Sequence, residues 1–143
     1  MSISTDELAR YLDGYLRIAE VPDEPGAVNG LQVANRGAVG SIVAAVDASQ
    51  ATIDAVVLAM RDTPGDPPLL LVHHGLFWDG NQPVVGRRYR RLSALLAHDI
   101  AVYSAHIPLD IHPEVGNNAV LARDLGLRTA QPFDLYKGVP LGV

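Results

Sequence analysis

Hydrophobic residues recur along this chain in two patterns, one with the period of a helix and one typical of a buried strand. At the start of the chain, Leu8, Leu12 and Tyr15 repeat at helical spacing and predict a helix over about residues 4–18. The sequence STDE at Ser4–Glu7 predicts a capping box in front of it. The chain therefore begins with an amphipathic helix.

Further along, short runs of aliphatic residues alternate with helical patterns. The nearly continuous apolar runs are typical of strands buried on both faces, and each is followed by a helix. This order predicts an α/β fold with a mainly parallel sheet flanked by helices on both faces. The expected strands are 31–35, 41–47, 69–74 and 100–106, and the expected later helices are 50–62, about 87–98 and about 114–126.

Composition narrows the class of protein. The 143 residues, 48% hydrophobic and 19% charged, predict a single α/β domain over 1–143. A net charge of −5 argues against nucleic acid or an anionic membrane as the main partner. The chain has no cysteine, so a metal would need His, Asp or Glu ligands. With no apolar run of about 20 residues and no signal-peptide pattern, we expect a cytoplasmic protein.

Polar side chains stand where the predicted strands end. Asp47 closes one strand, His73 and His74 close the next, and His106 and Asp110 follow the third. Ligands gather beyond the carboxyl ends of parallel strands, because the strand-to-helix loops converge there. Imidazole and carboxylate bind divalent Zn, Mn, Fe or Ni, which this pattern does not distinguish. The alternative is that these side chains are hydrogen-bonded structural groups.

Two adjacent histidines raise a geometric difficulty. Successive residues of a strand point to opposite faces, so His73 and His74 can share a metal only if the strand ends or bends there. Gly75 follows them directly and permits such a turn.

Three segments together resemble a known family. They are NGLQV at Asn29–Val33, HHGLFWDG at His73–Gly80, and the stretch Ala105–Leu127 that begins AHIPLDIHPEVGNN. In this order they are similar to the Nif-three-like family, also called GTP cyclohydrolase I type 2 homologs or dinuclear metal-centre hexameric proteins. The resemblance implies an α/β scaffold with two divalent metal ions per site, in a homohexameric ring whose metal centres face an interior cavity.

The resemblance also implies roles for single residues. His73 and His74 match the family's paired histidine ligands, and Asp110 matches its carboxylate ligand. His106 matches the histidine four positions before that carboxylate, and we expect it to orient a metal ligand or to face the substrate.

The pattern departs from the family near the end of the chain. Members complete the metal site with a His-x-x-x-Glu pair, whereas this chain has no His after His112 and no Glu after Glu114. We therefore expect the N-terminal portion of a longer protein, with the C-terminal part of the family fold missing. A natural short form is the alternative. Three ligands would hold one ion at most, so we expect weak, single-metal or no binding.

An arginine cluster begins the third predicted helix. Its cations lie in the first turn, where the helix dipole disfavours positive charge. They form either an anion-binding site at the mouth of the metal cavity or salt bridges to acidic residues. The members of the cluster are Arg87, Arg88, Arg90 and Arg91.

Several other residues carry two interpretations each. Phe77 and Trp78 could stack on a nucleobase, but we favour a subunit interface. Asn117 and Asn118 could bind a ligand or satisfy backbone donors. Asp47 could support the site or cap the following helix.

Three functions are compatible with these patterns. The first is a metal-dependent hydrolase acting on a phosphorylated or nucleotide-like small molecule. The second is a non-catalytic metal-binding or metal-handling oligomer that uses the same ligands. The third makes the polar strand ends structural. The arginine cluster favours the first function, because its positive charge suits an anionic substrate.

Overall fold

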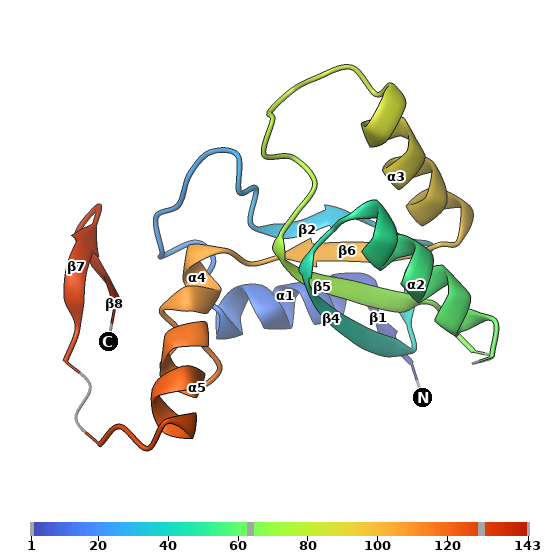
Figure 1. Cartoon of the computed structure of the whole chain (residues 1–143). Helices are drawn as coiled ribbons and strands as arrows, with labels where there is room; N and C mark the ends of the chain where they lie inside the picture. The colour runs from blue at the N-terminus through green and yellow to red at the C-terminus, as the bar shows by residue number, and fades with distance from the viewer. Residues whose placement is uncertain (1, 63–64, 129–130, 143) are drawn as a thin grey trace.

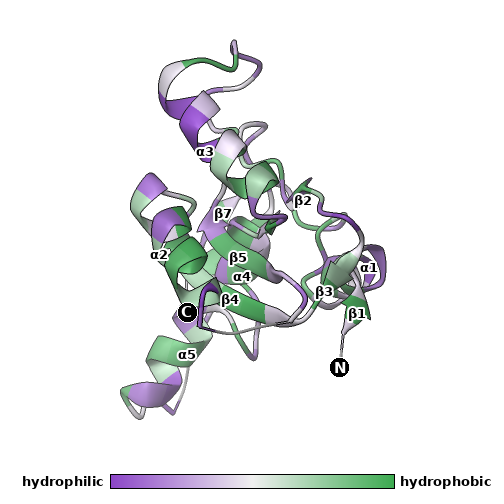
Figure 2. Cartoon of the chain, turned by 90° about the vertical axis from the view of Figure 1, so that its right-hand side faces the viewer, coloured by the Kyte–Doolittle hydropathy of each residue, from purple (hydrophilic) through white to green (hydrophobic). Residues whose placement is uncertain are grey.

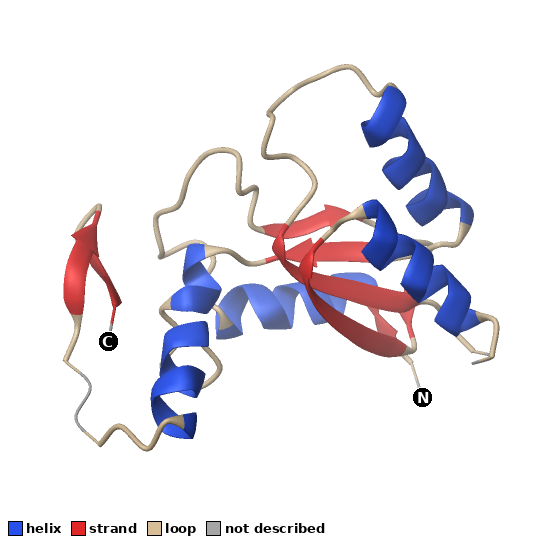
Figure 3. Ribbon diagram, viewed as in Figure 1, coloured by secondary structure: helices blue, strands red, loops and turns tan. Residues whose placement is uncertain are grey.

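A four-stranded sheet with helices on both faces forms the centre of the computed structural model, which describes residues 2–62, 65–128 and 131–142 (Figures 1 and 3). In the order of the sheet its strands are β2 (Gly30–Val33), β6 (Ala101–Ser104), β5 (Pro68–His74) and β4 (Ser41–Asp47).

The sheet is mixed, whereas the sequence predicted a mainly parallel sheet. β4, β5 and β6 run parallel to one another, whereas β2 pairs antiparallel with β6. The helical crossovers after β4 and β5 force those strands to be parallel. β2 precedes both crossovers, and nothing in its four residues fixes its direction. The α/β class and the helical layers are as expected.

Two apolar cores lie on the two faces of the sheet. Leu69 of β5 packs in the core under α1 (Thr5–Tyr15), whereas Leu70 packs in the core under α2 (Gln50–Met60) and α3 (Gly86–Ala97). Both leucines are 0% exposed, and each contributes about 1.5–3 kcal/mol of burial free energy. This alternation along β5 explains why its sequence is almost purely aliphatic.

The start of α1 differs from the prediction. The short strand β1 (Ile3–Ser4) pairs with β3 (Ala38–Val39), and the Ser4 side chain makes no capping hydrogen bond. The backbone N–H of Thr5 instead donates to the carbonyl of Gly37 at 3.1 Å. The predicted capping box is therefore wrong, because strand pairing holds Ser4 in place of a cap.

The C-terminal quarter leaves the sheet. A single turn of helix, α4 (Ile107–Asp110), follows β6 and leads to α5 (Asn117–Asp124). The chain then forms a hairpin of β7 (Phe133–Tyr136) and β8 (Val139–Gly142), which lies to one side of the sheet (Figure 1). Over the residues described, no helix has the length and apolar character needed to cross a membrane.

Candidate metal centre

The carboxyl end of β5 brings His73 and His74 together. The strand ends at His74, and the two ring centroids lie 4.5 Å apart. Gln32 of β2 fixes the turn that follows: its Oε1 accepts from the N–H of Leu76 at 2.7 Å. A Cβ at Gly75 would overlap the carboxamide of Gln32, so a larger residue there would displace that side chain from its hydrogen bonds. The predicted strand end at the histidines is thus explained by a close contact with β2.

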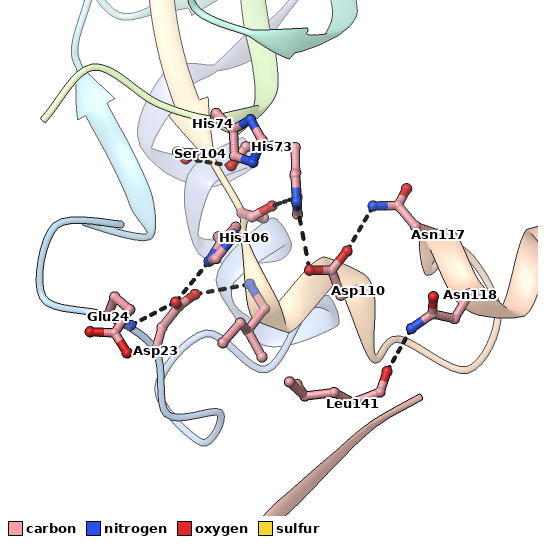
Figure 4. Close-up of polar contacts among 12 residues, drawn as sticks. Asp23, Glu24, His73, His74, Ser104, His106, Asp110, Asn117, Asn118 and Leu141 are labelled. Carbon is pink, nitrogen blue, oxygen red and sulfur yellow. Dashed lines mark hydrogen bonds and ion pairs between the residues drawn. The ribbon is translucent and has the colours of Figure 1, made fainter. Parts of the chain in front are cut away.

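His106 joins this pair from the neighbouring strand. Its ring centroid lies 4.8 Å from that of His73 and 5.6 Å from that of His74. One ring nitrogen from each of the three histidines falls within 4.8 Å of the others, so the cluster could hold a metal ion. The close-up shows the rings converging beyond the ends of β5 and β6 (Figure 4). The structure therefore groups His106 with the two expected ligands, whereas the family resemblance implied that it orients a metal ligand or faces the substrate.

The three imidazole rings share one hydrogen-bonding arrangement, in which Nδ1 lies against a protein oxygen. The pairs are His73 with the carbonyl of Ala105 at 3.1 Å, His74 with Asp47 at 2.8 Å, and His106 with Asp23 at 2.8 Å. Carbonyl and carboxylate oxygens only accept, so Nδ1 of each neutral ring carries the proton. Each Nε2 then has a free lone pair, which is the tautomer found in metal-ligating histidines.

Asp23 is the residue that sequence reasoning missed. It lies in the loop between α1 and β2, and its side chain is only 7% exposed. Besides His106, it accepts from Asn29 at 2.8 Å and from the backbone N–H groups of Glu24 and Ile107. Burial alone would raise the pKa of Asp23, but the hydrogen bonds from Asn29, His106 and the two backbone groups outweigh it and lower the pKa. The carboxylate therefore stays charged and anchors His106.

Asn29, which belongs to the NGLQV segment, is the sequence signal that could have led to Asp23. Its Nδ2 donates to Asp23, while its Oδ1 accepts from the backbone N–H of His106 at 2.8 Å. The NGLQV segment thus supplies two side chains, Asn29 and Gln32, that hold the histidine-bearing loops. The NGLQV segment therefore positions the site.

Asp110 lies at the side of the cluster. Its Oδ2 is 3.6 Å from Nε2 of His73, and its Oδ1 accepts from Nδ2 of Asn117 at 2.8 Å (Figure 4). Asn118 donates instead to the carbonyl of Leu141 at 2.6 Å. Asn117 thus orients a candidate ligand, whereas Asn118 tethers the C-terminal hairpin.

Asp47 supports His74 rather than capping α2. Its carboxylate accepts from His74, whereas the N-cap of α2 is Ser49, whose hydroxyl accepts from the N–H of Thr52 at 3.1 Å. Of the two roles considered for Asp47, the structure supports the one at the site.

Comparison with known proteins places this arrangement in a family. Residues 3–142 match the family described as Duf34/NIF3 (NGG1p interacting factor 3). The chain belongs to the Duf34/NIF3 family. This confirms the resemblance drawn from the three sequence segments.

Relatives of this Duf34/NIF3 chain are about twice as long. A Deinococcus radiodurans protein named GTP cyclohydrolase 1 type 2 homolog is 45% identical over 141 residues, which are 99% of this chain and 51% of the relative. A Pseudomonas aeruginosa protein of the same name is 47% identical over 135 residues, covering 94% and 50%. A crystal structure of a Thermus thermophilus protein matches with a TM-score of 0.83 and 47% identity, covering 92% and 52%. The chain thus spans about half the length of these relatives.

The aromatic residues of the Duf34/NIF3 chain after Gly75 lie against the site. The Trp78 ring meets His106 edge-on at 4.8 Å and His74 at 5.9 Å between centroids. Phe77 lies under the guanidinium of Arg88, 5.5 Å from ring centroid to Cζ. Trp78 is 38% exposed, so it forms a wall of the histidine cluster that solvent still reaches.

The predicted arginine cluster divides into separate roles. Arg88 holds the loop before α3, because its guanidinium donates to Asp79 at 2.9 Å and to the carbonyls of Gly80 and Gln82. Arg87 and Arg91 instead line a pocket that also includes His74. The end of α3 that carries the arginines is hydrophilic, in contrast to the apolar α2 beside it (Figure 2). The salt-bridge interpretation is therefore confirmed for Arg88, whereas anion binding by the other arginines stays a prediction.

Proposed function

We propose that this chain binds a divalent metal ion, Zn, Mn, Fe or Ni, through His73, His74 and Asp110, with His106 as a further ligand. We propose that the complete protein is a metal-dependent hydrolase of a phosphorylated or nucleotide-like small molecule. The observation that supports binding most strongly is the shared orientation of the three imidazole rings. Each Nδ1 is held by an acceptor, which leaves each Nε2 available to a metal.

The spacing of the donors fits an ion after small adjustments. Two ligands of a tetrahedral ion with bonds of about 2.1 Å lie about 3.4 Å apart. Nε2 of His73 and Oδ2 of Asp110 are 3.6 Å apart, close to that value. The three histidine nitrogens lie within 4.8 Å of one another, so side-chain movements of about 1 Å would bring them within bonding distance of one ion.

The surrounding residues prepare the site for hydrolysis. A divalent ion bound there would supply Lewis-acid activation of water and of a substrate oxygen. Asp23 and Asp47 hold the rings of His106 and His74 in a fixed orientation. Trp78 covers one side of the cluster and limits the approach of solvent. The site thus combines fixed donors with an open, partly apolar approach.

A non-catalytic role in binding or handling a metal is the second candidate. The three carboxylates nearest the histidines, Asp23, Asp47 and Asp110, already accept hydrogen bonds from His106, His74 and Asn117. Among the described residues, none of these carboxylates is left without a partner to serve as a general base. This observation favours storage or transfer of the ion over catalysis by this half of the protein.

The family resemblance supports the remaining proposals. We propose a second metal ion per site and a homohexameric ring for a protein of the relatives' full length, in which a His-x-x-x-Glu pair would supply the additional ligands. The negative net charge gives no support for a nucleic-acid partner. A cytoplasmic location is proposed on the composition alone.

Metal analysis of purified protein tests the binding proposal. We expect His73→Ala and Asp110→Ala to lose bound metal after dialysis, whereas wild type and His98→Ala retain it. His98 is a matched control because it is exposed at the end of α3, outside the cluster. Equal metal content in all four proteins would contradict the proposal. If metal binds and a panel of phosphate esters and cyclic nucleotides stays intact with the complete protein, the non-catalytic candidate gains.

A further inference from the structure

A pocket of about 320 Å³ lies on the α2 and α3 side of the histidine cluster. His74 and Trp78 line it together with the segment that leads into α2, the loop after β5 and the first turns of α3. Its volume is at the lower end of the range for small-molecule sites. Because His74 also belongs to the histidine cluster, a ligand in this pocket would reach the candidate metal centre.

The pocket holds more positive charge than its acidic residues neutralise. Three arginines and two aspartates line it, which leaves one positive charge in excess: Asp79 is paired with Arg88, and the neutral ring of His74 donates to Asp47 without cancelling its charge. Across the described parts of the chain, Arg87 and Arg91 form no hydrogen bond or ion pair. Two guanidinium groups therefore have no hydrogen-bonded anion among the described residues.

Arg91 is the arginine of the pocket whose positive charge is least favourably placed. Its Nε is shielded from solvent and has no hydrogen-bond partner among the described residues. Burial and the neighbouring charge of Arg87 lower the pKa of Arg91, against weaker opposing effects of Asp79 and Asp47. An anion in the pocket would supply the missing hydrogen bonds and offset the excess positive charge.

The first turn of α2 adds to this field. Its N-cap residue Ser49 lines the same pocket, so the positive end of the helix dipole faces the space that the arginines surround. Arg90 lies in the same turn of α3 and is exposed, as Arg87 is, but it does not line the pocket. The surplus charge is therefore specific to the pocket side of the helix.

We propose that Arg87 and Arg91 form an anion site for the phosphate group of a small molecule, beside the histidine cluster and independent of a bound metal. Two guanidinium groups suit a phosphate dianion better than a single carboxylate, and their planar donors match its oxygens. That the rest of this molecule reacts at the histidines rests on the proposed function.

Binding of inorganic phosphate to metal-free protein tests the site. Trp78 is the only tryptophan of the chain and lines the pocket, so its fluorescence reports on occupancy. In chelator-treated protein at low ionic strength, we expect saturable binding to wild type and Arg90→Gln. We expect Arg91→Gln and Arg87→Gln each to bind about tenfold or more weakly, from the loss of charged hydrogen bonds. Arg91→Lys should fall between them and wild type, and acetate should bind more weakly than phosphate.

Two results would overturn the anion site: no saturable phosphate binding by wild type, or equal affinity in Arg91→Gln and Arg90→Gln. Metal content separates this outcome from failure of the proposed function. Arg91→Gln should retain wild-type metal, whereas His73→Ala should lose metal and keep phosphate binding. If no variant affects metal content but phosphate binding follows the arginines, the metal proposal fails and the anion site stands.

Discussion

Replacing Asp23 by asparagine removes the charge that anchors His106 while keeping the shape of the side chain. The amide keeps one accepting oxygen, which can serve either His106 or the backbone N–H of Ile107, whereas its nitrogen cannot accept from the other; the remaining bond to His106 also loses its charge. Loss of a partner that orients a ligating histidine typically lowers metal affinity 10–100-fold. We therefore expect Asp23→Asn to weaken zinc binding by about 1.4–2.7 kcal/mol.

Competition with a chromophoric chelator measures this affinity directly. Asp54→Asn is the matched control, because Asp54 is an exposed carboxylate on α2 that accepts only from Gln50. We expect the control to bind zinc like wild type. Equal affinity in Asp23→Asn and wild type would refute the claim that Asp23 supports a ligand.

The Asp23→Asn variant also tests a predicted pH dependence of the free energy of unfolding. The folded-state pKa of Asp23 is lowered, so its stabilising contribution is complete above the unfolded value of about 3.9 and is lost as pH falls through the lower folded value. In chelator, we expect wild type to exceed Asp23→Asn by about 2–3 kcal/mol at pH 7. That difference should shrink below pH 4. A difference that stays constant down to pH 3 in urea unfolding would contradict the pKa direction.

Two further predictions concern the supports around the site. Gly75→Ala should lower the free energy of unfolding in urea by about 1–3 kcal/mol, because its methyl group meets Gln32. The control Gly14→Ala, in an open position of α1, should raise it by about 0.5–1 kcal/mol. Changes of the same sign in both variants would contradict the close contact at Gly75. Arg88→Ala should cost about 1.5–3 kcal/mol and speed limited proteolysis near Asp79, whereas unchanged cleavage would show that Arg88 does not hold the loop.

The sequence predicts the layers of the fold well because burial leaves a periodic trace. The aliphatic run of β5 and the spacing of Leu8 and Leu12 in α1 mark residues that the structure buries. Strand direction leaves no such trace, so the pattern does not reveal that β2 is antiparallel. Likewise, nothing local indicates that Ser4 pairs with β3 and loses its capping role.

The candidate site is predictable only in part, for a similar reason. His73 and His74 stand out because polar residues at the end of an aliphatic strand are conspicuous. Asp23 does not, because its role depends on contacts with His106, more than eighty residues further along the chain. Whether an arginine is paired depends on neighbours that sequence does not place, as Arg88 and Arg91 show.

Nitrogen NMR of the histidine rings during a zinc titration tests the central claim most directly. In metal-free protein, we predict the Nδ1–H tautomer for the three clustered histidines. His112 should show the opposite tautomer, because its Nε2 lies 3.1 Å from the carbonyl of Tyr15 and its Nδ1 accepts from backbone N–H groups. Zinc should then shift the Nε2 signals of His73, His74 and His106 together and leave His112 and His98 unchanged. Nε2–H tautomers in the cluster, or equal shifts in all five histidines of the chain, would contradict a metal centre at the end of β5.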